Sequence, residues 1–138
     1  MSEAMMIGRD EFLKKLDEAY AFRASGDREG LASILAPDMK FRIAGEEGSI
    51  PGVPQTGTAM AKIGEMIGTF HLHSVKRADA VVEGHKAAVL WNVVLTFRDG
   101  EKVNAELYDL WTIGDDGKLT SLLQFGDAAL VAHVLGKA

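Results

Sequence analysis

The chain has 138 residues, a formal net charge of −5 at pH 7 and 47% hydrophobic residues, so we expect a single domain over residues 1–138 with a packed core rather than a disordered chain. An acidic surface repels phosphate backbones and anionic lipid headgroups, which makes nucleic acid and membranes unlikely partners. The lack of cysteine excludes disulfides and thiol catalysis, and no targeting segment is recognisable before Arg9 and Asp10, so we expect a cytoplasmic protein.

The first third of the chain has the residue spacing of helices. Apolar side chains recur at helical intervals between Phe12 and Tyr20. The segment Ser25-Gly26-Asp27 combines a helix stop with an N-cap for a short second helix over residues 28–35. Further along, we expect a strand over residues 39–43, a loop over residues 44–57 and a third helix that begins at Thr58.

From residue 72 onward, long β-rich runs replace the helical pattern. Three turn signals divide them: Glu83-Gly84-His85-Lys86, Asp99-Gly100 and Asp115-Asp116-Gly117. They predict a meander of four long antiparallel strands, followed by a closing helix that Asp127 caps. Helices followed by strands indicate the α+β class, with the N-terminal helices packed on a mainly antiparallel sheet.

The turn at Asp99-Gly100 predicts which residues share a face of the sheet. A two-residue turn there places Leu90 opposite Asp109 and Asn92 opposite Leu107, and cross-strand partners share a face. One face then carries Leu90, Asn92, Val94, Leu107, Asp109 and Trp111, and the reverse face carries Trp91, Val93, Leu95, Phe97, Glu106, Tyr108 and Leu110. Both faces are largely apolar, so we expect the first to pack against the helices and the reverse, outer face to form a homodimer.

The position of the last strand depends on the loop at Asp115-Asp116-Gly117. A three-residue loop places Leu119, Ser121, Leu123 and Phe125 beside Trp111 and Asp109, whereas a four-residue loop reverses the strand. We favour the three-residue loop because it gathers the apolar side chains on one face. A β-bulge would change either assignment.

Asp109 is the residue on this face that needs an explanation. A charge among Leu90, Leu107 and Trp111 is costly unless the carboxyl group is paired, solvated or protonated. Burial raises the pKa of a carboxyl group, and a neutral carboxylic acid can donate a hydrogen bond. We therefore favour an acid in a pocket, directed at a carbonyl or hydroxyl group, over a structural ion pair with Arg77 or Arg42.

Several other side chains are candidates for the same pocket. Tyr20 lies on the apolar stripe of the first helix, where its hydroxyl either reaches a ligand or bonds a backbone carbonyl. Asn92 shares the predicted face of Asp109 and can orient a ligand. The residues expected to line either a core or a cavity are Trp111, Phe125, Phe41, Leu107 and Leu90.

The histidines do not predict a metal site. His71 and His73 have a spacing that can ligate a metal on a strand, but no further ligand completes the set and a solvated strand edge is the simpler interpretation. His85 lies in a turn and His133 on the last helix. Asp127 is either a second acid at the pocket rim or simply an N-cap, and the cap explains its position.

Six segments, in this order, resemble the SnoaL-like polyketide cyclases: Tyr20 to Asp27, Leu31 with Leu35-Ala36-Pro37-Asp38, the loop Pro51 to Gly57, Tyr108-Asp109-Leu110-Trp111, Asp116-Gly117-Lys118-Leu119, and Phe125-Gly126-Asp127. These cyclases belong to the nuclear-transport-factor-2-like superfamily, which also contains the ketosteroid isomerases. The resemblance implies a cone-shaped α+β fold in which helices close over a strongly curved sheet around an apolar pocket. It also implies a homodimer through the outer face of the sheet.

The resemblance further implies a role for Asp109, which matches the carboxylic acid of the ketosteroid isomerase oxyanion hole. The stretch Phe41 to Gly45 carries no carboxylate where the isomerases have their general base, and Glu46 and Glu47 follow only on the predicted loop. The general base is therefore unassigned, and strict ketosteroid isomerase activity is not expected. We expect isomerase, cyclase or hydrolase chemistry without a cofactor, in which Asp109 and Tyr20 polarise the oxygen of an apolar carbonyl compound. The alternatives are a non-catalytic ligand-binding protein and a dimeric assembly module.

Overall fold

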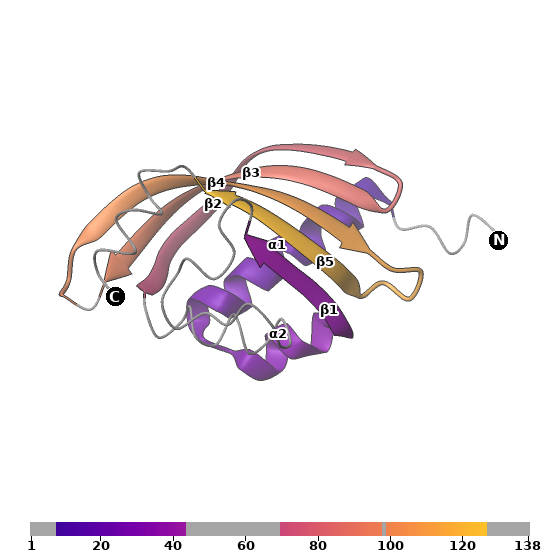
Figure 1. The fold of residues 1–138 in the computed structure, drawn as a ribbon, viewed down its shortest axis with the longest axis horizontal. Helices are drawn as coiled ribbons and strands as arrows, with labels where there is room; N and C mark the ends of the chain where they lie inside the picture. The colour runs from indigo at the N-terminus through magenta and orange to yellow at the C-terminus, as the bar shows by residue number, and fades with distance from the viewer. Residues whose placement is uncertain (1–7, 44–69, 98, 127–138) are drawn as a thin grey trace.

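The computed structural model describes residues 8–43, 70–97 and 99–126 (Figure 1). The predicted loop over residues 44–57, the helix expected from Thr58 and the closing helix lie outside these residues, as do Glu46, Glu47, Asp127 and His133. The described elements are α1 (Arg9–Ser25), α2 (Arg28–Ile34), β1 (Leu35–Ile43), β2 (Phe70–Glu83), β3 (Lys86–Phe97), β4 (Lys102–Ile113) and β5 (Leu119–Gly126).

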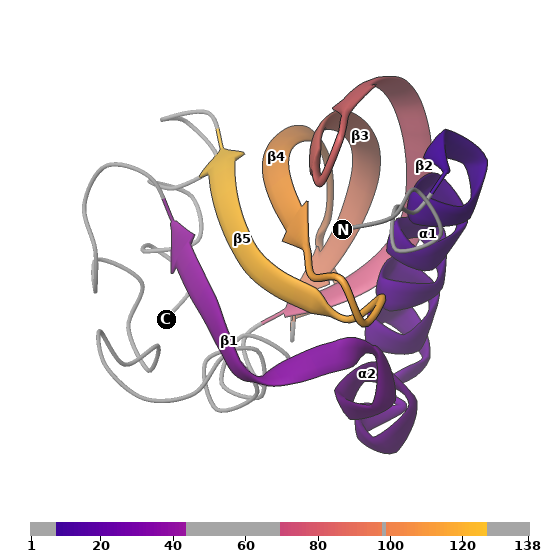
Figure 2. The same cartoon turned by 90° about the vertical axis from the view of Figure 1, so that its right-hand side faces the viewer.

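The five strands form one sheet in the order β1-β5-β4-β3-β2. The meander β2 to β5 is antiparallel, as predicted, and β1 joins its edge parallel to β5. The sheet arches over α1 and α2, which cover its concave side (Figures 1 and 2). β-bulges in β2, between Leu72 and Ser74 and between Arg77 and Asp79, add to the curvature. The predicted α+β class and the curved, mainly antiparallel sheet are confirmed.

The corner between the two helices lies where the sequence predicts it, but α2 ends at Ile34 and β1 begins at Leu35, whereas the sequence predicts a strand only from residue 39. Gly26 follows α1 with a φ of 76°, in the left-handed region that glycine adopts without strain, and its N–H bonds the carbonyl of Arg23. The carboxylate of Asp27 accepts a hydrogen bond from the Gly30 N–H at 2.9 Å and caps α2. The corner between the helices lets α1 pack along the sheet. The buried face of α1 consists of Phe12, Leu13, Leu16, Ala19 and Tyr20.

The register of β3 and β4 differs by one residue from the prediction. Phe97 and Glu101 close the hairpin, since the Phe97 N–H bonds the Glu101 carbonyl and the Gly100 N–H bonds the Phe97 carbonyl. Gly100 has a φ of 86°, so this is a three-residue loop with a glycine bulge rather than a two-residue turn. Asp109 therefore lies opposite Val89, not opposite Leu90.

A one-residue slip moves every side chain of a strand to the other face. The residues predicted to form the outer face, Trp91, Val93, Leu95 and Phe97, are instead buried on the concave side of the sheet, where they belong to the same core as the buried face of α1. The true outer face carries Leu90, Tyr108, Leu110, Leu123 and Phe125, which are cross-strand neighbours. Tyr108 and Phe125 are 48% and 46% exposed there.

The last hairpin has the predicted three-residue loop, but a bulge reverses the expected face. The Gly114 N–H bonds the Lys118 carbonyl, and Gly117 has a φ of 81°. The register then shifts beyond Ile113, so that Thr112 pairs with Ser121 and Trp111 with Leu122. Leu122 and Gln124, rather than Leu123 and Phe125, consequently share the face of Asp109.

Candidate functional site

Asp109 is the centre of a buried polar cluster on the concave face of the sheet. Its side chain is 1% exposed, on β4, and it accepts hydrogen bonds from three side chains. The Tyr20 hydroxyl on α1 and the Trp111 indole N–H both donate to Oδ2, the latter at 3.0 Å. The Gln124 amide on β5 donates to Oδ1 at 3.2 Å. Three separate elements thus hold one carboxyl group in a fixed orientation.

Burial dominates the electrostatics of this carboxyl group. Desolvation raises the pKa of Asp109 from 3.8 to about 6, because the charged form loses its water. The hydrogen bonds from Tyr20, Gln124 and Trp111 oppose this rise by stabilising the carboxylate. The indole N–H of Trp91 acts in the same direction, although it forms no hydrogen bond within the described residues. A pKa near 6 lets Asp109 exchange a proton close to neutral pH.

Tyr20 connects Asp109 to the interior of the fold. Its ring packs against Trp91 with centroids 4.4 Å apart and meets the edge of Trp111 at 6.3 Å. Its hydroxyl also accepts a hydrogen bond from the Gln124 amide at 3.0 Å. Burial and the neighbouring Asp109 raise the pKa of Tyr20 well above its ordinary value, so the phenol stays protonated and available as a donor.

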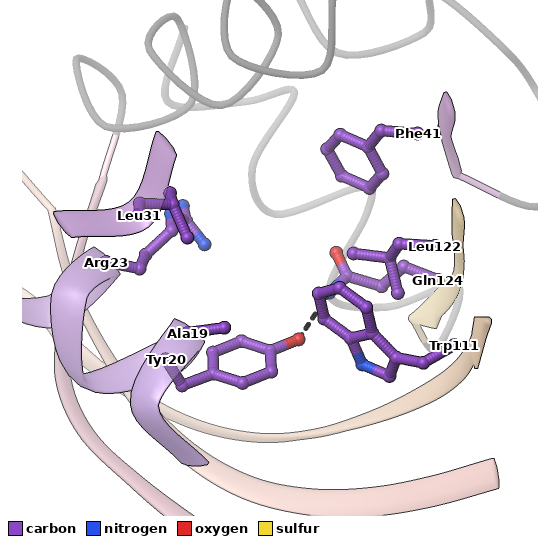
Figure 3. A pocket seen from close by; sticks show the side chains of 8 residues that line it. All are labelled: Ala19, Tyr20, Arg23, Leu31, Phe41, Trp111, Leu122 and Gln124. Atoms are coloured by element: carbon purple, nitrogen blue, oxygen red, sulfur yellow. Dashed lines mark hydrogen bonds between the residues drawn. The ribbon is translucent and has the colours of Figure 1, made fainter. Parts of the chain in front are cut away.

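A cavity opens beside this cluster, between α1, α2 and the β1–β5 edge of the sheet (Figure 3). Its volume is about 30 Å³, within a region of about 360 Å³ of unoccupied space that includes open solvent. The cavity has room for one functional group or for one or two waters. The described part of its wall consists of Ala19, Tyr20, Arg23, Leu31, Phe41, Trp111, Leu122 and Gln124. Asp109 itself lies behind Tyr20, Trp111 and Gln124, so it reaches the cavity through their side chains.

The cavity also contains a charged side chain from α1. Arg23 follows Tyr20 by three residues, which places both on the same helical face. Its guanidinium group faces the amide oxygen of Gln124 and the ring of Phe41 across the cavity (Figure 3). Burial lowers the pKa of Arg23, while the electrostatic attraction of Tyr20 and Asp109 raises it. The described part of the wall is therefore apolar except for a phenol, an amide, an indole and a guanidinium.

The structure brings together five of the eight residues that the sequence singled out. Asp109 and Tyr20 are hydrogen-bonded, Trp111 and Phe41 line the cavity beside them, and Leu107 is buried on the same face. The three others are Leu90, Asn92 and Phe125, and they lie on the outer face of the sheet. The register slip moves Leu90 and Asn92 there, and the bulge in β5 moves Phe125, so none of the three can contact a ligand bound beside Asp109.

The competing interpretations of the polar residues can also be placed. Arg77 forms an ion pair with Asp17 at 3.0 Å on the surface, not with Asp109, and Arg42 is exposed. His71 and His73 are exposed on β2. His85 bonds the Ile113 carbonyl through Nδ1 at 2.9 Å. Within the described residues, no group of three acidic or histidine side chains is placed to hold a metal ion.

Sequence reasoning missed two of the polar side chains at the cavity. The favoured three-residue loop places Gln124 on the face opposite Asp109, because nothing in the sequence indicates the bulge in β5. Arg23 follows Tyr20 by three residues on the helix, but the sequence assigns it no role. An arginine on the apolar stripe of an amphipathic helix was the signal available for it.

Solved structures of other proteins have a similar fold. The structure is similar to TerC co-crystallised with polyporic acid, with 20% identity over 91% of this chain and 98% of TerC and a TM-score of 0.73. It is similar to Δ5-3-ketosteroid isomerase from Mycobacterium sp. (20% identity, 86% and 95% of the two chains, TM-score 0.69). It is also similar to an epoxide hydrolase from Mycobacterium tuberculosis that resembles limonene epoxide hydrolase (14% identity, 91% and 90%, TM-score 0.71).

These similarities show the nuclear-transport-factor-2-like fold. No curated protein sequence matches the chain. None of the helices in the described part of the chain is long and apolar enough to cross a membrane. The sequence profile of the SnoaL-like domain matches residues 16–122, from the middle of α1 to the middle of β5. The chain therefore belongs to the SnoaL-like domain family.

Proposed function

We propose that this protein binds a small, largely apolar carbonyl compound in the cavity and that Tyr20, supported by Asp109, donates a hydrogen bond to its oxygen. The observation that carries the proposal is the buried Tyr20–Asp109 hydrogen bond at the edge of the cavity. The ligand oxygen would lie beside the Tyr20 hydroxyl, and the apolar body would pack against the apolar wall that includes Phe41 and Leu122.

The proton on Asp109 decides in which direction the Tyr20 hydroxyl points. With Asp109 ionised, Tyr20 donates to the carboxylate, as in this structure. With Asp109 protonated, the acid donates to the Tyr20 oxygen, and the phenolic proton becomes available to a ligand in the cavity. The two hydrogen bonds then reinforce each other in a buried site of low dielectric. A pKa of about 6 for Asp109 makes this second arrangement accessible near neutral pH.

Such a pair stabilises negative charge that develops on a carbonyl oxygen, which is the requirement of enolisation and of related isomerase, cyclase or hydrolase steps. Tyr20 would be the catalytic residue that touches the substrate, and Asp109 would act through it. No cofactor is needed for this acid-side chemistry. The solved structures named above support the proposal, since one was co-crystallised with polyporic acid and two are an isomerase and an epoxide hydrolase.

One observation favours a second function, a non-catalytic ligand-binding protein. Proton abstraction needs a general base within hydrogen-bond reach of the ligand. In the part of the cavity wall that the structure describes, no carboxylate or histidine touches the cavity directly. With the same residues, the site would then orient its ligand without turning it over.

A single cyclic enone, 2-cyclohexenone, can distinguish these two functions. The chain has only two tryptophans, Trp91 and Trp111, and both contact Tyr20, so their two indole N–H signals in an ¹⁵N NMR spectrum report on the site. We expect both signals to shift on titration with the enone. In D₂O buffer, the acidic C–H protons of the enone exchange slowly without protein. Exchange that the protein accelerates would identify a catalyst, whereas binding without accelerated exchange would identify a binding protein.

The tyrosines offer a matched control for this experiment. Tyr20→Phe removes the hydroxyl at the cavity, and we expect it to weaken enone binding about tenfold and to abolish any catalysed exchange. Tyr108→Phe makes the same change on the outer face, and both properties should be unchanged. Wild-type indole signals that do not respond to the enone, or equal effects of the two substitutions, would contradict the proposal.

We further propose a homodimer through the outer face of the sheet, with an interface that differs from the predicted one. The exposed rings of Tyr108 and Phe125 are cross-strand partners and are flanked by Leu90, Leu110 and Leu123. A contiguous apolar patch of this kind is typical of a protein–protein interface. The cytoplasmic location stays a prediction.

A further inference from the structure

Gln124 uses only the donor end of its amide in the structure. Its NH₂ group donates to the Tyr20 hydroxyl at 3.0 Å and to Asp109 Oδ1 at 3.2 Å, so both N–H bonds are directed at the polar cluster. The amide oxygen, Oε1, accepts no hydrogen bond from any residue in the described part of the chain. A side chain that is only 6% exposed thus presents an acceptor that these residues leave unused.

Asp109 determines which end of the Gln124 amide faces the cavity. An ionised carboxylate can only accept hydrogen bonds, so the NH₂ group must be the end that faces it. Oε1 is therefore turned away from Asp109 and Tyr20 and into the cavity, as Figure 3 shows. A buried acceptor without a donor is unfavourable, which indicates that a molecule in the cavity supplies the donor.

This acceptor lies next to the donor that the proposed function assigns to the carbonyl oxygen of the ligand. The NH₂ group bonded to Tyr20 and Oε1 belong to the same amide, so the Tyr20 hydroxyl and Oε1 are neighbours in the cavity wall. The cavity volume of about 30 Å³ has room for one or two waters, and equally for two ligand oxygens on adjacent carbons. Only a ligand whose donor is close to its carbonyl oxygen can therefore reach both groups.

We propose that Gln124 selects carbonyl compounds with a hydroxyl group on the neighbouring carbon, namely α-hydroxy ketones and enolised 1,2-diketones. The carbonyl oxygen accepts from the Tyr20 hydroxyl, and the ligand hydroxyl donates to Gln124 Oε1. This inference rests on the proposed function, because it assigns Tyr20 and Gln124 to the same ligand. A site with a buried acceptor discriminates against an analogue that lacks the donor, since the acceptor then stays unpaired.

Three 4-pyranones that differ only at the carbon beside the carbonyl provide matched probes, and all three are uncharged at pH 5.5. This carbon carries hydrogen in 4-pyranone, a hydroxyl donor in 3-hydroxy-4-pyranone, and an oxygen without a proton in 3-methoxy-4-pyranone. At pH 5.5 Asp109 is mostly protonated, since its pKa is about 6, so the Tyr20 proton is available to the carbonyl oxygen. The affinities can be measured from the indole N–H shifts of Trp91 and Trp111.

We expect the wild-type protein to bind 3-hydroxy-4-pyranone at least about fivefold more tightly than either of the other two probes. Gln124→Met keeps the length of the side chain but removes the acceptor oxygen, so the preference should fall below about twofold. Asn92→Met removes an exposed amide on the outer face, and the preference should match that of the wild type. The comparison of the three probes with the wild type tests the inference even where Gln124→Met fails to fold.

The outcomes separate this inference from the proposed function. Equal wild-type affinities, a methoxy compound that binds as tightly as the hydroxy compound, or a hydroxyl preference that persists in Gln124→Met would overturn the role of Gln124 and leave the carbonyl pocket intact. An equal loss of the preference in Asn92→Met would also overturn that role. Indole signals that respond neither to the pyranones nor to 2-cyclohexenone would overturn both proposals.

Discussion

The raised pKa of Asp109 predicts that the protein becomes less stable as the pH rises. The native state holds the proton of Asp109 up to a pKa of about 6, whereas the unfolded chain releases it near 3.8. The native state therefore binds more protons between these values, and the free energy of unfolding falls with increasing pH. The difference in pKa corresponds to about 3 kcal/mol, most of which is lost between pH 4 and pH 8.

Asp109→Asn isolates this contribution from those of the other ionisable groups. The side-chain oxygen of an asparagine can still accept hydrogen bonds from Tyr20 and Trp111. The asparagine NH₂ group can donate a hydrogen bond to the oxygen of Gln124 if the Gln124 amide rotates, so we expect the variant to fold. Urea denaturation should be measured from pH 4 to pH 8 for the wild type, for Asp109→Asn and for Asp38→Asn, which changes an exposed carboxylate.

The wild type and Asp38→Asn should lose about 2 kcal/mol more than Asp109→Asn over this range. Parallel profiles for the wild type and Asp109→Asn would refute the reasoning. A profile in which the wild type gains stability relative to Asp109→Asn as the pH rises would mean that the hydrogen bonds to Asp109 outweigh its desolvation.

Three other substitutions test separate parts of the structure. Tyr20→Phe removes a donor that lowers the pKa of Asp109, so the carboxyl ¹³C titration midpoint should move above 6, and an unchanged or lower midpoint would contradict this hydrogen bond. Gly26→Ala places a side chain at a φ of 76°, which should cost about 1 kcal/mol in urea denaturation, and unchanged stability would show that α1 ends differently. Tyr108→Arg adds a charge beside Phe125, so sedimentation should show a dimer in the wild type and monomers in the variant; a wild-type monomer at micromolar concentration would remove the proposed interface.

The sequence predicted the elements and their order better than it predicted which faces they present. Gly26 with Asp27, the Gly84 turn and the three-residue loop at Gly117 each have a local chemistry that one or two residues determine. The elements themselves follow from hydrophobic periodicity, which is also local. These features therefore appeared in the structure where they were expected.

The faces of the strands depend on single-residue irregularities that leave little trace in the sequence. Asp99-Gly100 is compatible with both a two-residue turn and a three-residue loop, and only the left-handed Gly100 after the turn distinguishes them. The bulge in β5 after Leu119 has no glycine to mark it. Each irregularity reversed one face, which is why Trp91 was expected outside and Leu90 inside.

The candidate site was predicted in its centre and not in its surroundings. Asp109 was singled out because a carboxylate between Leu107 and Trp111 is out of place in either register. Tyr20 followed from the stripe of α1. Gln124 could not be assigned without the bulge, and the position of Asp109 behind Tyr20, rather than in the cavity wall, depends on the packing of three elements.

The ionisation of Asp109 is the most direct test of this account, because the stability profile and the proton arrangement with Tyr20 both depend on it. The measurement is an NMR titration of the carboxyl carbons in protein labelled with ¹³C at aspartate, with Asp109→Asn to assign the signal. We predict a midpoint near pH 6 for Asp109. A midpoint at or below 4 would show that the carboxylate is stabilised by its donors more than it is destabilised by burial, and would contradict the role proposed for it.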